Sequence, residues 1–61
     1  MRSFRFFEDK LLAMEFRQRT QGTLYTNEPF SKTSKYWKLY ATIAQDIGVD
    51  TQDKPFVVIW D

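Results

Sequence analysis

The feature that most constrains the fold is an apolar run near the carboxyl end, Phe56–Trp60. Its β-branched and aromatic residues favour an extended strand, in which successive side chains point to opposite faces. One face would carry Phe56, Val58 and Trp60, and the other Val57 and Ile59. Both faces are apolar, whereas a surface strand of a small antiparallel sheet has one polar face. The run is therefore predicted either to be a central strand or to meet a partner with one face or one edge.

Two helices are hardly enough to cover both faces of a sheet, which keeps the partner interpretation open. A strand at the chain end can pair with the sheet edge of another protein, or with a second copy as a homodimer. Trp60 is the best single contact, because large amphipathic rings are common binding hot spots. The predicted partner-binding residues are Trp60, Ile59, Val57, Phe30 and Tyr25. If the strand is central, the polar loop from Gly22 to Thr33 is the next candidate surface.

A helix is predicted over residues 34–47, because its apolar residues fill one broad arc at about 100° per residue. These residues are Tyr36, Trp37, Tyr40, Ala41, Ile43, Ala44 and Ile47. Thr33 or Ser34 can cap the start, and Gly48 stands where a left-handed residue often ends a helix.

The arc of this helix is expected to build the core. We predict that Trp37, Tyr40, Ala44 and Ile47 pack against Phe7, Leu11 and the final strand.

The first 26 residues allow two interpretations. Acidic Glu8 comes early and basic Arg19 late, as the helix dipole favours, so a helix is predicted over about 8–20. Residues 2–7 can form a strand, and so can 23–26. A competing interpretation makes 13–19 and 23–26 a hairpin around Gly22. The fold class is predicted to be α+β, a single small domain over 1–61 with two helices on a short sheet that includes strand 56–60.

The composition argues against an enzyme. Aromatic residues make up 18% of the chain, while histidine and cysteine are absent. The chain thus lacks the commonest general base, the most reactive thiol and the main ligands of transition metals. We expect no catalytic residues, no metal site and no cofactor. The acidic residues Asp46, Asp50 and Asp53 are interpreted as a solvated rim, since calcium loops space their ligands more closely.

The function that these features favour is a small non-enzymatic protein-binding module with an aromatic core, acting as an inhibitor, adaptor or accessory subunit. A complete small viral or bacterial gene product of phage or plasmid type is expected. The longest apolar run has five residues, against the roughly 20 that span a bilayer, so the predicted location is the cytoplasm, away from membranes.

The alternative function is a nucleic-acid-binding regulator. Lys32, Lys35 and Lys38 interleave with aromatic residues, a combination that can bind phosphates and stack bases. The lysines and the rings are expected to point to opposite sides of the helix, which weakens this interpretation. Residues 43–51 also resemble the first helix and turn of a degenerate helix-turn-helix, although Pro55 interrupts the place of the recognition helix.

Overall fold

The computed structural model describes residues 2–61 and shows an α+β domain of two helices and three strands. Along the chain the elements are β1 (Ser3–Phe7), α1 (Lys10–Thr20), β2 (Thr23–Thr26), α2 (Ser34–Asp46) and β3 (Phe56–Trp60). The predicted fold class is confirmed. The strand at residues 2–7 and the helix after it are both present, and the hairpin over 13–26 is wrong because residues 10–20 are helical.

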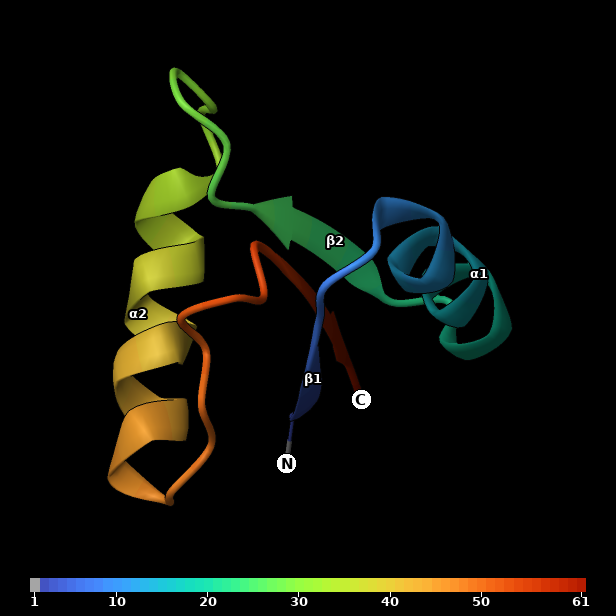
Figure 1. Cartoon of the computed structure of the whole chain (residues 1–61). Helices are drawn as coiled ribbons and strands as arrows, with labels where there is room; N and C mark the ends of the chain where they lie inside the picture. The colour runs from blue at the N-terminus through green and yellow to red at the C-terminus, as the bar shows by residue number, and fades with distance from the viewer. Residues whose placement is uncertain (1) are drawn as a thin grey trace.

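The three strands form one antiparallel sheet in the order β1-β3-β2, so the C-terminal strand is central. Ser3 lies opposite Trp60, which brings the two ends of the chain together (Figure 1). On the other edge of β3, Leu24 lies opposite Val58. Both edges of β3 are therefore hydrogen-bonded within the chain, and the free edges of the sheet belong to β1 and β2.

One helix covers each face of the sheet, with α2 on one side and α1 on the other (Figure 1). The sequence-based expectation that two helices hardly suffice is wrong, because the sheet is only three short strands wide. The predicted alternation of β3 is confirmed. Val57 and Ile59 face α2, whereas Phe56 and Val58 face α1, and all four are buried.

The core under α2 contains the largest buried ring, Trp37, which meets Phe6 edge to face with ring centroids 5.6 Å apart. Ala41 and Ala44 of α2 are buried in the same cluster, together with Val57 and Ile59 of β3.

The core under α1 is smaller. Ala13 is the one residue of α1 that is fully buried, and it packs with Phe56 and Val58. Around this centre lie partly buried aromatic rings. Phe16 makes edge-to-face contact with Trp60 at 4.9 Å between centroids and tilted contact with Phe7 at 5.2 Å. The guanidinium carbon of Arg5 lies 5.7 Å from the centre of the Phe16 ring, within cation–π range.

Part of the predicted core is placed differently. Trp37 and Ala44 are buried and Tyr40 is partly buried, as expected. Ile47 and Leu11 are 69% and 70% exposed, so their predicted burial is wrong. Phe7 packs under α1 rather than against α2, because its position in β1 points to the α1 face. Tyr36 and Ile43 of the same arc are also exposed, because a sheet only three strands wide contacts one side of the arc.

The helix ends also differ in part from expectation. Gly48 has φ +92°, so the predicted left-handed position after α2 is confirmed. After α1 the left-handed residue is Gln21, with φ 55°. Gly22 serves another purpose, because a Cβ there would lie 2.5 Å from the carbonyl oxygen of Ile59. Thr33 occupies the N-cap position of α2 without the predicted capping hydrogen bond.

Candidate docking surface

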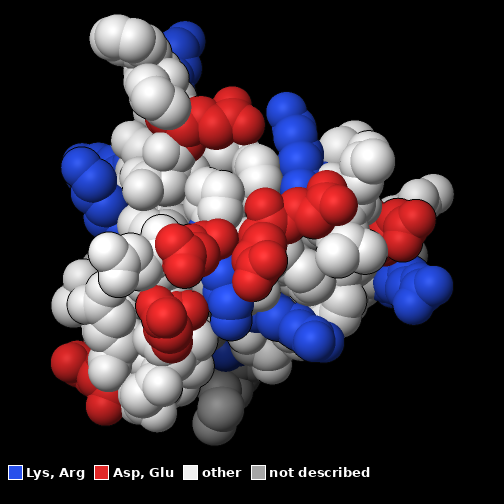
Figure 2. Space-filling model, viewed as in Figure 1, with Lys and Arg blue, Asp and Glu red and all other residues white. Residues whose placement is uncertain are grey.

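The loop between β2 and α2 projects from one end of the molecule (Figure 1). Phe30 lies in this loop and its side chain is fully exposed, with a relative exposure of 105%. Its backbone is left-handed, with φ 64°. A bulky residue with positive φ is a strained outlier, which persists only where the surrounding structure imposes it. The space-filling view shows uncharged side chains at the outermost point of the loop (Figure 2).

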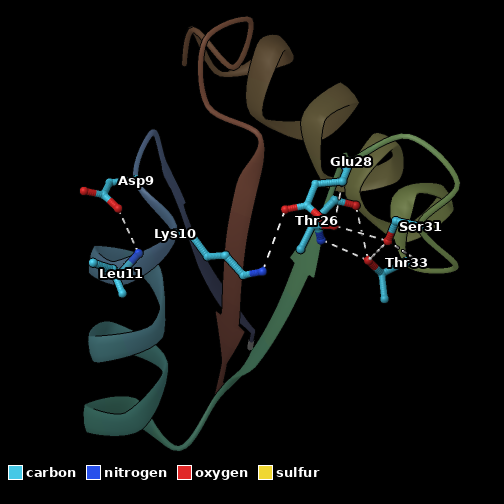
Figure 3. Close-up of polar contacts among 7 residues, drawn as sticks. All are labelled: Asp9, Lys10, Leu11, Thr26, Glu28, Ser31 and Thr33. Carbon is cyan, nitrogen blue, oxygen red and sulfur yellow. Dashed lines mark hydrogen bonds and ion pairs between the residues drawn. The ribbon is translucent and has the colours of Figure 1, made fainter.

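Hydroxyl groups fix the shape of this loop (Figure 3). The Thr33 hydroxyl accepts a hydrogen bond from the Thr26 backbone N–H at 2.9 Å and donates one to the Thr26 carbonyl at 3.2 Å. Because that hydroxyl has a single proton, Ser31 is the donor in the 2.8 Å contact between the Ser31 and Thr33 hydroxyls. Thr26 in turn donates to the Ser31 hydroxyl at 3.2 Å.

Backbone hydrogen bonds close the same loop. The Ser31 N–H donates to the Glu28 carbonyl at 3.1 Å, and the Asn27 N–H donates to the Pro55 carbonyl at 2.8 Å. Lys10 and Glu28 form an ion pair of 3.9 Å that joins α1 to the loop (Figure 3). This pair is about half exposed and contributes little. The loop is therefore held from both sides of Phe30 while the ring itself touches solvent.

The other predicted partner-binding residues do not lie on one accessible surface. Val57 and Ile59 are buried between the sheet and α2, so they are not accessible in the folded chain. Trp60 is partly buried against Phe16. With both edges of β3 hydrogen-bonded, the predicted pairing of this strand with a partner or a second copy has no free edge. Only Phe30 of the predicted set is fully exposed.

Tyr25 borders an exposed apolar surface on α2 that was not predicted from the sequence. Its ring packs on the ring of Tyr36 at 5.4 Å, and Tyr36 is half exposed. Along the same side of α2 lie further exposed apolar residues: Leu39, Ile43 and Ile47. The sequence contained a signal for this surface, because the apolar arc of α2 is wider than one sheet contact. The alanines at 41 and 44 lie on the side of the arc that is buried against the sheet.

Of the lysines of the alternative interpretation, Lys35 and Lys38 lie in α2, and Lys32 precedes it. Trp37 is buried and Tyr40 partly buried, on the side opposite Lys35 and Lys38, as expected. Tyr36, the third ring expected in the core, is 52% exposed, so its predicted burial is wrong. Basic and acidic side chains are interspersed on the face that Figure 2 shows.

The helix-turn-helix interpretation of residues 43–51 is wrong. After α2 the chain turns at Gly48, runs through a loop to Pro55 and enters β3. No second helix follows the turn in the part of the chain that is described. The strong β-propensity of 56–60 prevails over the resemblance.

Within residues 2–61, no group of three or more acidic side chains is positioned to hold a metal ion. Interaction with the Tyr40 side chain, and then with Asp61, raises the pKa of Arg2, which leaves this exposed guanidinium a fixed cation. The salt bridge from Arg2 to Asp61 measures 3.9 Å and joins the two ends of the chain, which lie at the same end of the sheet.

Comparisons with known protein families, curated proteins and solved structures find no match to this chain. Neither α1 nor α2 has the length and apolar character needed to cross a membrane.

Proposed function

We propose that this chain is a small non-enzymatic docking module, an inhibitor, adaptor or accessory subunit, that inserts Phe30 into an apolar pocket of a partner protein. The observation that carries the proposal is the combination at this residue of full exposure and a left-handed backbone. Removing an aromatic ring from water is favourable, and the fully exposed Phe30 ring is not buried within its own chain.

The rigidity of the loop supports this role. The hydroxyl contacts among Thr26, Ser31 and Thr33 order the backbone before a partner arrives. A preordered loop loses less conformational entropy on binding, so more of the contact energy contributes to affinity. The strain at Phe30 also fits a binding site, because strained residues concentrate where structure is kept for function.

Affinity capture from a lysate of the source cells tests the proposal. The wild-type chain is compared with Phe30→Ala and with Leu12→Ala, which truncates an exposed apolar side chain on α1. We expect Phe30→Ala no longer to capture the protein. Its free energy of unfolding should stay within about 0.5 kcal/mol of the wild-type value, as for other surface substitutions. Leu12→Ala should retain capture. Equal capture by Phe30→Ala and wild type would contradict the proposal.

Nuclease treatment of the lysate distinguishes the alternative function. A docking module should capture the same protein with and without nuclease. Material that is captured only when nucleic acid is intact, and is released steeply by salt, would favour the regulator that uses Lys32, Lys35 and Lys38.

The strain itself has a measurable consequence. Phe30→Gly removes the ring, as Phe30→Ala does, but glycine adopts positive φ without a steric penalty. We expect Phe30→Gly to unfold with a free energy about 1 kcal/mol higher than Phe30→Ala, from chemical denaturation of both variants. Equal stabilities would show that the backbone at residue 30 relaxes out of the left-handed region.

A further inference from the structure

We propose that a second copy of this chain docks on the exposed side of α2, so that two α2 helices pack antiparallel about a twofold axis. The surface is an apolar stripe that remains 43–69% exposed. It consists of Tyr36, Leu39, Ile43 and Ile47. This inference goes beyond the docking of Phe30 and does not depend on it.

The stripe follows the helix closely. Its residues are spaced by three, four and four positions, which places them on one side of α2 over about three turns. No charged residue interrupts it. At its first residue the stripe adjoins the sheet, since Tyr36 packs on Tyr25 of β2. In Figure 1 the outer side of α2 has no other described element against it. A continuous apolar stripe of this kind is how helices recognise one another.

Antiparallel pairing about a point between Leu39 and Ile43 makes the stripe complementary to itself. Leu39 then lies beside Ile43 of the second copy, and Tyr36 lies beside Ile47 of the second copy. The same register places Lys35 beside Asp46 of the second copy, on one flank of the stripe. A twofold axis forms each of these contacts twice.

The charges along α2 support this orientation. Figure 2 shows basic groups at the upper left edge, where α2 begins in Figure 1, and acidic groups at the lower left, where it ends. Lys35 lies in the first turn and Asp46 is the last residue, and α2 has no acid in its first turn and no base in its last. This order opposes the helix dipole and costs the isolated helix free energy. An antiparallel neighbour reverses the effect, because each basic end meets an acidic end.

The order of charges along α2 favours a second copy over an unrelated partner. An unrelated protein would have to present an apolar groove with the opposite charge order, whereas an antiparallel copy presents it by symmetry. The other exposed apolar side chains do not compete. Leu11 and Met14 on α1 span a single turn and are followed by Glu15 and Gln18.

The predicted dimer is weak and leaves the docking loops free. One helix of 13 residues gives an interface at the small end of the range, below about 1,200 Å² in total, so we expect a dissociation constant in the micromolar range. Antiparallel pairing places the two Phe30 loops at opposite ends. The dimer would therefore be bivalent for its partner.

Sedimentation equilibrium over a concentration series, up to about 1 mM, tests the dimer. We expect wild type to dimerise and Ile43→Asp to weaken dimerisation at least about a hundredfold, because a carboxylate would replace a central apolar contact on both copies. Leu11→Asp, on α1, is the matched control and should dimerise as wild type does. Circular dichroism of each variant checks that it remains folded.

Charge exchange tests the register. Lys35→Glu should weaken the dimer roughly tenfold, because each copy then places a second carboxylate beside Asp46 of the other. The double variant Lys35→Glu with Asp46→Lys should restore the wild-type affinity by exchanging the two charges. If Lys35→Glu has no effect, or the double variant restores nothing, the antiparallel register is wrong.

The outcomes separate this inference from the proposed function. A wild-type chain that stays monomeric throughout the series would overturn the dimer, as would a dimer unaffected by Ile43→Asp. A monomeric chain that loses a captured protein through Ile43→Asp would show that another protein occupies the stripe. Phe30→Ala should leave the dimer intact, so its loss of capture tests the docking loop alone.

Discussion

The two helices cover opposite faces of the same strand in different ways. The α2 side buries Trp37, Ala41 and Ala44 completely or nearly so. The α1 side buries Ala13 alone and surrounds it with partly exposed rings such as Phe16. The strand between them contributes equally to both, since Val57 and Val58 are each fully buried. The difference therefore lies in the helices.

The rotation of α2 on the sheet decides which side of the helix is buried and which side remains free to bind. Next to the sheet, α2 uses one large ring and two alanines, which fixes its distance and rotation. That rotation leaves its other apolar residues facing outward, where Leu39 and Ile43 form a stripe. The helix that buries more of its own residues thus also offers the longer exposed apolar surface. The aromatic cluster under α1 is more open and should contribute less stability.

The largest expected difference between the two sides is in truncation of their rings. Trp37→Ala should lower the free energy of unfolding by about 3–5 kcal/mol, because it leaves a cavity in the better-packed core. Phe16→Ala should cost about 2 kcal/mol, since its ring is already partly exposed. Urea denaturation of both variants, with an unchanged slope, measures the difference. Equal losses would show that the two faces stabilise the domain alike.

The glycines that follow the two helices give a second, smaller difference. Gly22→Ala should cost about 2–3 kcal/mol, because the new Cβ would approach the Ile59 carbonyl to 2.5 Å and backbone would have to move. At Gly48 nothing lies within 4 Å of an added Cβ, and only the φ of +92° opposes it. Gly48→Ala should therefore cost about 1 kcal/mol. Thermal unfolding of both variants, in the same buffer, ranks them.

If Gly48→Ala lowers the stability more than Gly22→Ala, the close packing of residue 22 against β3 is not the tighter of the two constraints. The turn after α2 would then tolerate a side chain less well than the turn after α1.

The smallest expected effect concerns the indole N–H of Trp37 on the α2 side. The Trp37 indole N–H is buried without a hydrogen-bond partner, the one such side-chain atom within residues 2–61. Trp37→Phe loses part of a buried ring but also removes this unpaired donor, whose burial costs about 1–3 kcal/mol. We expect a net loss of no more than about 1 kcal/mol by urea denaturation. A loss as large as that of Trp37→Ala would mean that the N–H is satisfied.

Much of the fold could be predicted because it depends on local pattern. The strand at 56–60 follows from its β-branched and aromatic residues, and α2 from apolar spacing together with Gly48. The first 26 residues were ambiguous because α1 has mixed apolar positions and leaves Leu11 and Leu12 exposed. The contacts across the sheet decided between helix and hairpin there.

Less of the candidate docking surface could be predicted. Phe30 was among the predicted contacts, but its positive φ depends on hydroxyl contacts from Thr26 to Thr33 that close only in the folded loop. Val57 and Ile59 were wrongly expected to be accessible, because the sequence does not show how many faces two helices can cover. Tyr36, Ile43 and Ile47 of the stripe belong to the arc that was expected to build the core, whereas Leu39 does not.

The sequence alone determined that the segment at about 34–47 is helical and 56–60 extended, and that the final strand must be shielded from water. These properties depend on neighbours within a few residues along the chain. Only the tertiary structure decided that β3 lies between β1 and β2, with one helix on each face. It also decided which side of α2 meets the sheet, where Ala41 and Ala44 are buried while Leu39 and Ile43 stay exposed. Such a choice depends on the shapes of surfaces far apart in the sequence, which no local pattern records.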